Sequence, residues 1–329
     1  MKKYQVVGIG NAVVDVICES NDTFLSNNGI EKGIMQLVDQ GRGEALYAAM
    51  DNRVQTPGGS VANTIAGLGE LGLRTGFIGR VADDDLGLFY AQSMRDEGTE
   101  FVNAPVVNAE FPTSRSMIFV SPDGERSMNT YLGVSAELGP DDVSSDVAQN
   151  AEVVFLEGYL FDKDKGKEAF KKLARECRAA GGQAGISISD PFCVERHRDD
   201  FLGLIKNELD FVIGNEAEIT SLMQNDDLDA ALAAIAEITP LVVCTRSSDG
   251  VSAIRNGVRV DVPVERLTPI DTTGAGDQFA AGLIYGLVTG QDLAVACEMG
   301  CVAAGEVIRH IGPRPEQSVL ALFKARGLI

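Results

Sequence analysis

Residues 271–277 read Asp-Thr-Thr-Gly-Ala-Gly-Asp, and residues 278–287 continue as Gln-Phe-Ala-Ala-Gly-Leu-Ile-Tyr-Gly-Leu. The second stretch is predicted to form a helix, and the first places small residues at its mouth. Small residues there leave backbone N–H groups reachable, and the helix dipole adds to their attraction for an anion. We therefore predict an anion hole at Gly274, Ala275 and Gly276.

The carboxylate of Asp277 follows this predicted anion hole directly. A negative charge there is unfavourable if the hole only holds an anion. It suits a reaction in which Asp277 accepts the proton of a hydroxyl group that attacks the anion. The alternative is an Asp that caps the helix after a glycine turn. The full seven-residue pattern favours the catalytic interpretation.

A second glycine motif, Pro57-Gly58-Gly59-Ser60, precedes an amphipathic helix that is predicted to begin near Val61. One interpretation is a flexible turn with Ser60 as the helix N-cap. The other is that Gly58 and Gly59 let a ligand touch the backbone. Asn63, in the first turn, would then bind vicinal hydroxyl groups.

The rest of the chain alternates short β-branched runs with helical patterns such as residues 167–178 and 228–238. This alternation predicts an α/β fold with a mostly parallel sheet covered by helices on both sides. The predicted strands are Tyr4–Val7, Val153–Leu156, Gly185–Ser189, Phe211–Ile213 and Leu241–Cys244.

Two segments depart from this alternation, at about residues 11–39 and 114–130. The first reads as strand material with an Asn-Asn-Gly turn, and the second as a hairpin around Ser-Pro-Asp-Gly at 121–124. We expect them to form a small β-sheet that acts as a lid. The chain would then be a single domain, residues 1–329, with a discontinuous lid.

Ligands of open parallel sheets bind beyond the carboxyl ends of the strands. Gly8-Ile9-Gly10 at the first strand end is no dinucleotide fingerprint, because Val13 replaces the third glycine and residues 13–17 favour a strand. Asp15 is instead predicted to point into the cleft. The other predicted strand ends on this edge carry Glu157–Tyr159, Asp190, Asn215–Glu216 and Thr245–Arg246.

Net charge, cysteine spacing and hydropathy indicate which kinds of partner the protein binds and in which compartment we expect it. The 329 residues carry a net charge of −20, which disfavours binding to nucleic acid and to anionic membranes. The six cysteines form no CxxC pair, and zinc-ligand spacing is absent. The start of the chain lacks the pattern of a signal peptide, and no run of 18 apolar residues occurs. We expect a cytoplasmic protein with reduced thiols.

The two glycine motifs, together with residues 76–87, resemble the ribokinase (PfkB-type) family of carbohydrate and nucleoside kinases. The resemblance covers nearly the whole chain. It implies a ribokinase-like three-layer αβα fold, with ATP as phosphate donor and Mg²⁺ as cofactor. It also implies that Asp277 is the general base, that residues 274–276 form the anion hole, and that Asp15, Gly59 and Asn63 hold acceptor hydroxyls.

Asn215 and Glu218 match the NxxE motif of that family, which organises Mg²⁺ and phosphate, partly through water. An N-capped helix start remains the alternative for Asn215. The nucleotide-binding residues implied by the resemblance are Asn215, Thr245, Arg246, Gly250, Thr273 and Ala304. A K⁺ requirement and the choice between monomer and homodimer are left open.

Within the family the chain is most similar to the adenosine kinases, in residues 11–15, 191–192 and 303–312. Glu157-Gly158-Tyr159 and Thr273 depart from their pattern. The similarity implies phosphorylation of the 5′-hydroxyl of adenosine and a role in purine salvage. The apolar run Ala12-Val13-Val14 would cover the base, and Tyr159 would lie near the acceptor.

Two alternatives stay open. A sugar kinase of the ribokinase or fructokinase type would use the same chemistry on a small polyol. A non-catalytic nucleoside or sugar sensor would need no base, so the intact Asp277 argues against it. Arg126, in the predicted lid, is interpreted equally well as a phosphate contact or as a solvated surface residue.

Overall fold

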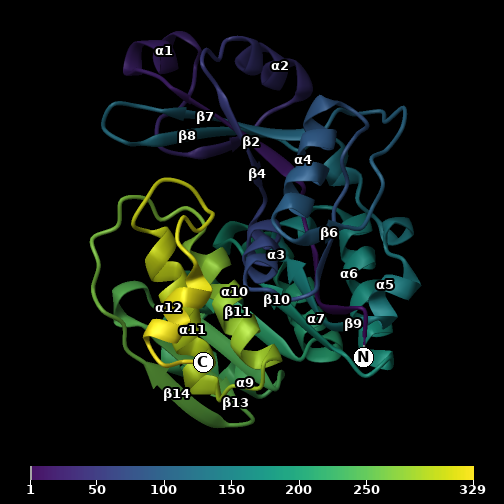
Figure 1. The fold of residues 1–329 in the computed structure, drawn as a ribbon, viewed down its shortest axis with the longest axis vertical. Helices are drawn as coiled ribbons and strands as arrows, with labels where there is room; N and C mark the ends of the chain where they lie inside the picture. Colours follow the sequence, from purple (N-terminus) through teal and green to yellow (C-terminus); the bar gives the residue numbers. More distant parts are fainter. Residues whose placement is uncertain (1) are drawn as a thin grey trace.

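A nine-stranded sheet forms the middle layer of the structure, a computed structural model that describes residues 2–329 (Figure 1). Its strands are parallel except for the last two, which form an antiparallel extension at one edge. All five strands predicted from the sequence are present in it. The order is β14 (Val258–Val262), β13 (Val251–Arg255), β12 (Leu241–Thr245), β11 (Phe211–Asn215), β10 (Gln183–Ser187), β9 (Ala151–Glu157), β1 (Tyr4–Ile9), β5 (Thr75–Ile78) and β6 (Thr99–Phe101).

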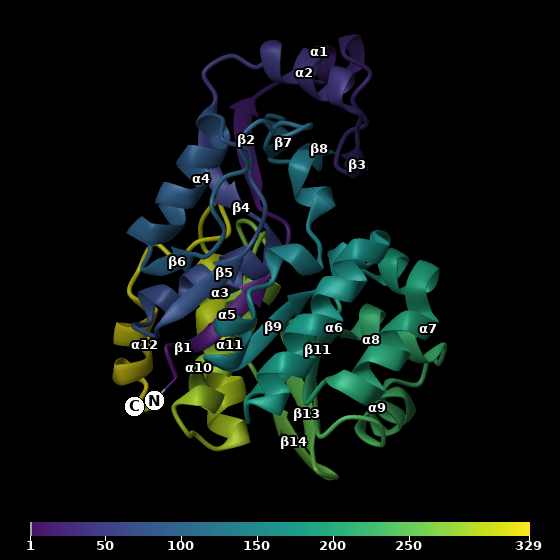
Figure 2. The same ribbon diagram turned by 90° about the vertical axis from the view of Figure 1, so that its right-hand side faces the viewer.

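Helices cover both faces of this sheet, as the sequence predicts (Figure 2). Strand residues alternate between two hydrophobic clusters: Val153 and Phe155 belong to one, and Val154 and Leu156 to the other. The first face packs against α3 (Ser60–Glu70), α4 (Asp85–Asp96), α10 (Ala275–Val288) and α11 (Leu293–Val307), with α12 (Val319–Ala325) outside α11. The second packs against α5 (Ser145–Gln149), α6 (Asp164–Ala179), α7 (Pro191–Glu208), α8 (Glu216–Met223) and α9 (Leu228–Ala236).

A second sheet of five strands lies beyond the carboxyl ends of the large sheet (Figure 1). The name lid is used below for this sheet together with α1 (Asp22–Asn27) and α2 (Gln40–Ala48), which cover its outer face. The expected hairpin is present, since β7 and β8 pair in antiparallel fashion. The order is β3 (Met35–Leu37), β8 (Arg126–Tyr131), β7 (Ser114–Val120), β2 (Val13–Glu19) and β4 (Val54–Gly58).

The expectation of strand material throughout residues 11–39 is wrong in part. Residues 22–27 form α1, because the side chain of Asn21 accepts a hydrogen bond from the backbone N–H of Phe24 and caps the helix. Asn27-Asn28-Gly29 therefore ends a helix instead of turning a hairpin. The sheet also contains β4, which the sequence did not indicate and which leads directly into the second glycine motif.

The order of the strands reverses at β1 and β9. From β1 the chain adds β5 and β6 on one side, and from β9 it adds the remaining strands on the other side. Such a reversal leaves a crevice at the carboxyl ends of the two strands. No helix in the described part of the chain is long and apolar enough to cross a membrane.

Candidate active site

Asp277 lies in the first turn of α10 and faces the first turn of α3. Its carboxylate accepts hydrogen bonds from Ser60 Oγ at 2.7 Å and from Asn63 Nδ2 at 2.9 Å. Burial raises its pKa to about 6, although these two hydrogen bonds oppose the rise. A carboxylate with a pKa close to neutrality is suited to accept a proton and to release it again.

Neither helix has the N-cap that the alternative interpretations of the two motifs assumed. The N-cap of α10 is Gly274, so Asp277 is the third helical residue and not a capping Asp. The N-cap of α3 is Gly59, whose positive φ of 103° a side chain would disfavour, and Ser60 is the first helical residue. The Ser60 hydroxyl therefore does not cap the helix and donates its hydrogen bond to Asp277 instead.

The glycines at the mouth of α10 differ in what they require. Gly274 has φ of +77°, and a Cβ there would lie 2.5 Å from Pro313, so no side chain fits. Gly276 is exposed, and a Cβ there would meet nothing within 4 Å. The N–H of Ala275 donates to the carbonyl of Thr272 at 3.2 Å. Within the described residues, the N–H groups of Gly274 and Gly276 have no hydrogen-bond partner and remain available to an anion.

Asp15 lies on β2 opposite Thr56 of β4. Burial raises its pKa to about 7, and the nearby guanidinium groups of Arg126 and Arg314 oppose that rise. A Cβ on Gly58 would lie 2.6 Å from the Asp15 carboxylate, and one on Gly59 would lie 2.2 Å from the Asn11 carbonyl. Both glycines of the second motif are therefore needed for the close packing of this corner.

Glu157 completes the corner; the sequence placed it at a strand end on the predicted ligand-binding edge but gave it no role in the site. It is 1% exposed at the end of β9 and accepts hydrogen bonds from Asn11 N, Asn11 Nδ2 and Val61 N at 2.8–3.1 Å. Burial raises its pKa to about 7. The Glu157 carboxylate thus links Asn11, between β1 and β2, to α3, whose first turn binds Asp277.

The expected apolar cover of the acceptor site is only partly correct. Ala12 and Val14 are fully buried in a hydrophobic cluster. Ala12 precedes β2 and lies beside Gly79, and Val14 is on the face of β2 that points away from Asp15. Val13 shares the opposite face with Asp15, as strand periodicity requires. Tyr159 lies in the short helix at 158–162 and is 36% exposed. Its pKa is raised, mainly by burial and to a smaller extent by the nearby charges of Asp190 and Glu157.

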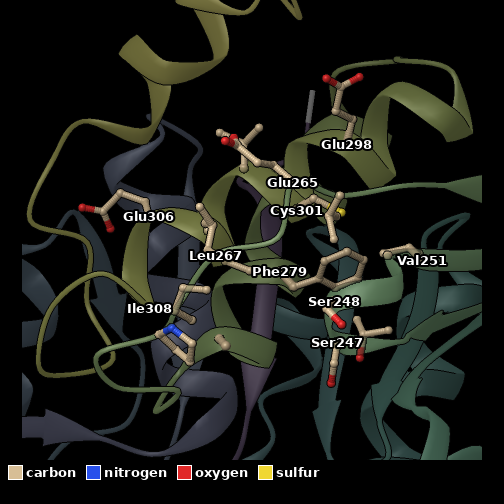
Figure 3. Close-up of a pocket in the computed structure, with 18 of the residues that line it drawn as sticks. Ser247, Ser248, Val251, Glu265, Leu267, Phe279, Glu298, Cys301, Glu306 and Ile308 are labelled. Carbon is tan, nitrogen blue, oxygen red and sulfur yellow. The ribbon is translucent and has the colours of Figure 1, made fainter.

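A cavity of about 590 Å³ lies on the other side of the α10 mouth (Figure 3). Ala275 and Gly276 are among the residues that line it, together with apolar side chains such as Leu267 and Phe279. Of the predicted nucleotide-binding residues, Thr245, Gly250 and Ala304 line this cavity. Asn215, Arg246 and Thr273 do not, and the Arg246 side chain donates to Ser252 instead.

Asn215 and Glu218 bind each other in a capping box at the start of α8. The Asn215 side chain accepts from Glu218 N at 2.9 Å, and both Glu218 carboxylate oxygens accept from Asn215. Burial raises the pKa of Glu218 to about 7. The described residues contain no cluster of three metal-ligating side chains, so direct coordination by several protein groups does not fit here.

Arg126 is not a solvated surface residue. Its side chain is 12% exposed, forms an ion pair with Asp271 at 2.9 Å and donates to Thr273 Oγ1 at 3.2 Å. Asp271 in turn accepts from the N–H of Gly312. The lid therefore contacts the 271–277 loop directly, through a cation beside the predicted anion hole.

Comparison with known proteins identifies the family. Residues 35–318 match the model of the pfkB family carbohydrate kinases. The chain belongs to the PfkB family of kinases. It has the ribokinase-like fold of that family and is a phosphotransferase that uses an alcohol group as acceptor. Kinases of this family use ATP as donor.

Solved structures and curated relatives include both nucleoside and sugar kinases. A probable sugar kinase from Rhizobium etli is 43% identical over 100% of both chains, with a TM-score of 0.91. The adenosine kinase from Sinorhizobium meliloti is 43% identical over 98% of this chain and 99% of the other, with a TM-score of 0.90. A 5-dehydro-2-deoxygluconokinase from Geobacillus thermodenitrificans is 28% identical over 76% of this chain and 78% of its own. The comparisons thus leave the acceptor open.

Proposed function

We propose that this PfkB-family kinase transfers the γ-phosphoryl group of ATP to the 5′-hydroxyl of a nucleoside, with adenosine as the preferred acceptor. One observation carries the chemistry: Gly276 lines the nucleotide-sized cavity, and the next residue, Asp277, is bound to the acceptor-side helix α3. Donor and acceptor sites would therefore meet at the first turn of α10.

The proposed steps follow from this arrangement. Asp277 takes the proton of the acceptor hydroxyl as its oxygen attacks the γ-phosphorus. The free N–H groups of Gly274 and Gly276 stabilise the charge that develops on the transferring phosphoryl group. Arg126 is close enough to this loop to add a positive charge there. Asp15 and Asn63 hold hydroxyl groups of the acceptor.

Mg²⁺, which the family typically uses, would neutralise charge on the donor phosphates. Glu218 is proposed to act on it through water, because both of its oxygens already accept hydrogen bonds from Asn215. The sequence leaves a K⁺ requirement open, and replacing K⁺ in the assay with a bulky organic cation checks it.

The charge of the acceptor corner favours an uncharged acceptor. Asp15, Glu157 and Asp277 lie close enough for Asp277 to raise the pKa of the other two. The nearest cations, Arg126 and Arg314, are already paired with Asp271 and Glu97. A sugar acid, as in the name of the Geobacillus relative, would bring a further negative charge into this corner and be repelled.

The lid face that carries Asp15 favours a nucleoside over a small polyol. Strand register places Ile17, Val54 and Ile118 side by side on this face, next to Met128 and Met35. Val54 is 60% exposed and Met35 is 45% exposed. A purine base is flat and mostly apolar and would cover such side chains, whereas a sugar would leave them facing hydroxyl groups.

A panel of acceptors tests the proposal. ADP release is measured with adenosine, guanosine, inosine, ribose, fructose and gluconate, and the product is identified by ³¹P NMR. We expect the highest kcat/KM with adenosine, formation of a 5′-monophosphate, and no turnover of gluconate. A higher kcat/KM with fructose or ribose would replace the nucleoside assignment by the second candidate, a neutral-sugar kinase, which the similarity to the Rhizobium etli protein also supports.

A further inference from the structure

Arg314 belongs to residues 308–318, which connect α11 to α12 without regular structure. Pro313, the residue just before Arg314, is held by Gln278 and by Gly274. The carbonyl of Pro313 accepts a hydrogen bond from Gln278 Nε2 at 3.1 Å, and the same amide donates to the carbonyl of Asn63 at 3.2 Å. Pro313 also packs against Gly274. The connection is therefore fastened to the first turns of both α3 and α10.

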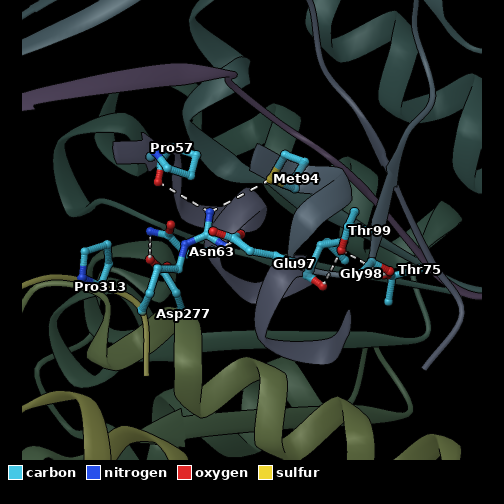
Figure 4. A network of polar contacts seen from close by, with 12 residues as sticks. Pro57, Asn63, Thr75, Met94, Glu97, Gly98, Thr99, Asp277 and Pro313 are labelled. Carbon is cyan, nitrogen blue, oxygen red and sulfur yellow. Dashed lines mark hydrogen bonds and ion pairs between the residues drawn. The ribbon is translucent and has the colours of Figure 1, made fainter. Parts of the chain in front are cut away.

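The side chain of Arg314 reaches from this connection to α4 and to the end of β4. Its guanidinium binds Glu97 at 2.5 Å, donates to the carbonyl of Pro57 at 3.4 Å and lies 3.9 Å from the sulfur of Met94. Figure 4 shows these three partners around one point, with Asn63 and Asp277 beside them. Only 15% of the side chain is exposed.

These contacts hold the turn that shapes the acceptor corner. Pro57 precedes Gly58, which packs against the carboxylate of Asp15 and whose carbonyl accepts a hydrogen bond from Tyr90 Oη at 2.9 Å. A shift of the Pro57 carbonyl would move Gly58 relative to Asp15. Arg314 therefore links three elements that are distant in sequence at the point where the lid joins α3.

The guanidinium also lies within electrostatic reach of both carboxylates that handle the acceptor. It opposes the rise in pKa that burial imposes on Asp15 and on Asp277. The other titratable groups that interact with it are Glu97, Glu70 and Tyr90. Glu97 is the only one of these within ion-pair distance of Arg314 in the described part of the chain.

We propose that Arg314 is a positioning residue for the acceptor half of the reaction. It holds the Pro57–Gly58 turn against Asp15 and places a positive charge beside Asp15 and Asp277. The proposal rests on the family's phosphotransfer chemistry and on the acceptor corner, and it holds for a nucleoside or for a sugar. It does not depend on contact between Arg314 and either substrate.

Two substitutions separate the proposed role from a general effect on folding. Arg314→Met removes the charge and the hydrogen bonds, and Arg314→Lys keeps the charge without the planar fork that spans Glu97 and Pro57. Arg175→Met is the control, because Arg175 forms an exposed ion pair with Glu208 on the far helices. KM for ATP, KM and kcat/KM for the acceptor between pH 5 and 9, and the unfolding temperature are measured for each variant.

We expect Arg314→Met to lower kcat/KM for the acceptor by about 10²-fold, as misplacement of a binding group does, and to leave KM for ATP within twofold. The acid limb of its pH profile should move to higher pH, because a charge that favours the ionised carboxylates is lost. Arg314→Lys should restore the acid limb but not the acceptor KM. Adenosine and fructose are both assayed, so a wrong acceptor assignment only changes which substrate reports the effect.

Equal losses for ATP and acceptor, with an unchanged acid limb and a lower unfolding temperature, would mean that Arg314 only stabilises the fold, and would overturn the proposal. If Arg314→Met does not fold, Arg314→Lys decides the question. An acceptor KM within twofold of the unmodified enzyme in that variant would equally overturn it.

Discussion

The proposed acceptor side and the proposed nucleotide side of the site meet at the mouth of α10 but are built from different groups. The acceptor corner contains the carboxylates of Asp15, Glu157 and Asp277, two of them held by hydrogen bonds from helix α3. The proposed nucleotide side is a cavity of about 590 Å³ lined mostly by small and apolar residues, with a few charged side chains such as Glu298 and Arg309.

This difference indicates where specificity and rate are set. Displacing charged groups from their positions in a buried corner costs a large free energy, because their surroundings cannot easily rearrange around a substitution. The cavity has room for altered side chains, and in the proposed function it mainly determines how tightly the donor binds. Substitutions on the acceptor side should therefore affect kcat and acceptor KM, and those on the nucleotide side the KM for ATP.

The largest effect is expected for Asp277→Asn, which keeps the size of the side chain and removes the proposed base. We expect kcat to fall by at least about 10²-fold, with KM for ATP little changed. Asp292→Asn is the matched control, because Asp292 is an exposed residue before α11 whose side chain makes no capping hydrogen bond. Turnover within a few-fold of the unmodified enzyme would exclude Asp277 as the base.

Asp15→Ala should act on the acceptor alone. A carboxylate accepts two hydroxyl hydrogen bonds at once, so its loss should raise the acceptor KM by roughly tenfold or more. Asp51→Ala, an exposed substitution in the lid, serves as control. If only KM for ATP changed, Asp15 would belong to the donor side and the division into two halves would fail.

Gly305→Leu tests the nucleotide side. Gly305 lines the cavity on α11, and a Cβ there would have its nearest contact at 3.5 Å from Leu267, so the helix accepts a side chain that then fills the cavity. We expect KM for ATP to rise about fivefold, the effect of a moderate steric conflict, with acceptor KM unchanged. Gly203→Leu on the exposed side of α7 controls for the loss of a helical glycine. An equal rise in acceptor KM would contradict the comparison.

Sequence reasoning succeeded where the signal is local. Each predicted parallel strand is a short β-branched run because both faces of the large sheet are buried. The 114–131 hairpin follows from its turn residues. The sequence did not indicate helix α1, because a helix of six residues is too short to show a clear hydrophobic periodicity and its N-cap, Asn21, is the main local signal.

The missing parts of the candidate site depend on partners distant in the chain. Glu157 binds the N–H of Asn11, 146 residues away, and Arg314 binds Glu97, 217 residues away. Ser60 looked like an N-cap because Ser commonly caps helices, but Gly59 takes that place and frees the hydroxyl for Asp277. No local pattern could indicate these pairs, because only the fold brings them together.

The smallest effect is expected for Ser60→Ala, and it concerns the pH dependence of the reaction. The Ser60 hydroxyl donates to the Asp277 carboxylate and favours its ionised form, so it holds the pKa below the value that burial alone would give. Below a pH of about 6 the base becomes protonated and kcat/KM should fall. Without the hydroxyl the carboxylate is harder to ionise, and this fall should begin at higher pH.

Thr64→Val is the matched control for that experiment. The Thr64 hydroxyl donates to the backbone carbonyl of Asp277 at 3.1 Å and not to its carboxylate, so its loss should leave the acid limb in place. kcat/KM for the acceptor is measured from pH 5 to 8 for both variants and the unmodified enzyme. A limb that moves equally in both variants would mean that the first turn of α3 acts on Asp277 through packing. If the acid limb moves only in Ser60→Ala, the effect belongs to the hydrogen bond between Ser60 and Asp277. The pKa of the proposed base would then be set by a group on the acceptor side.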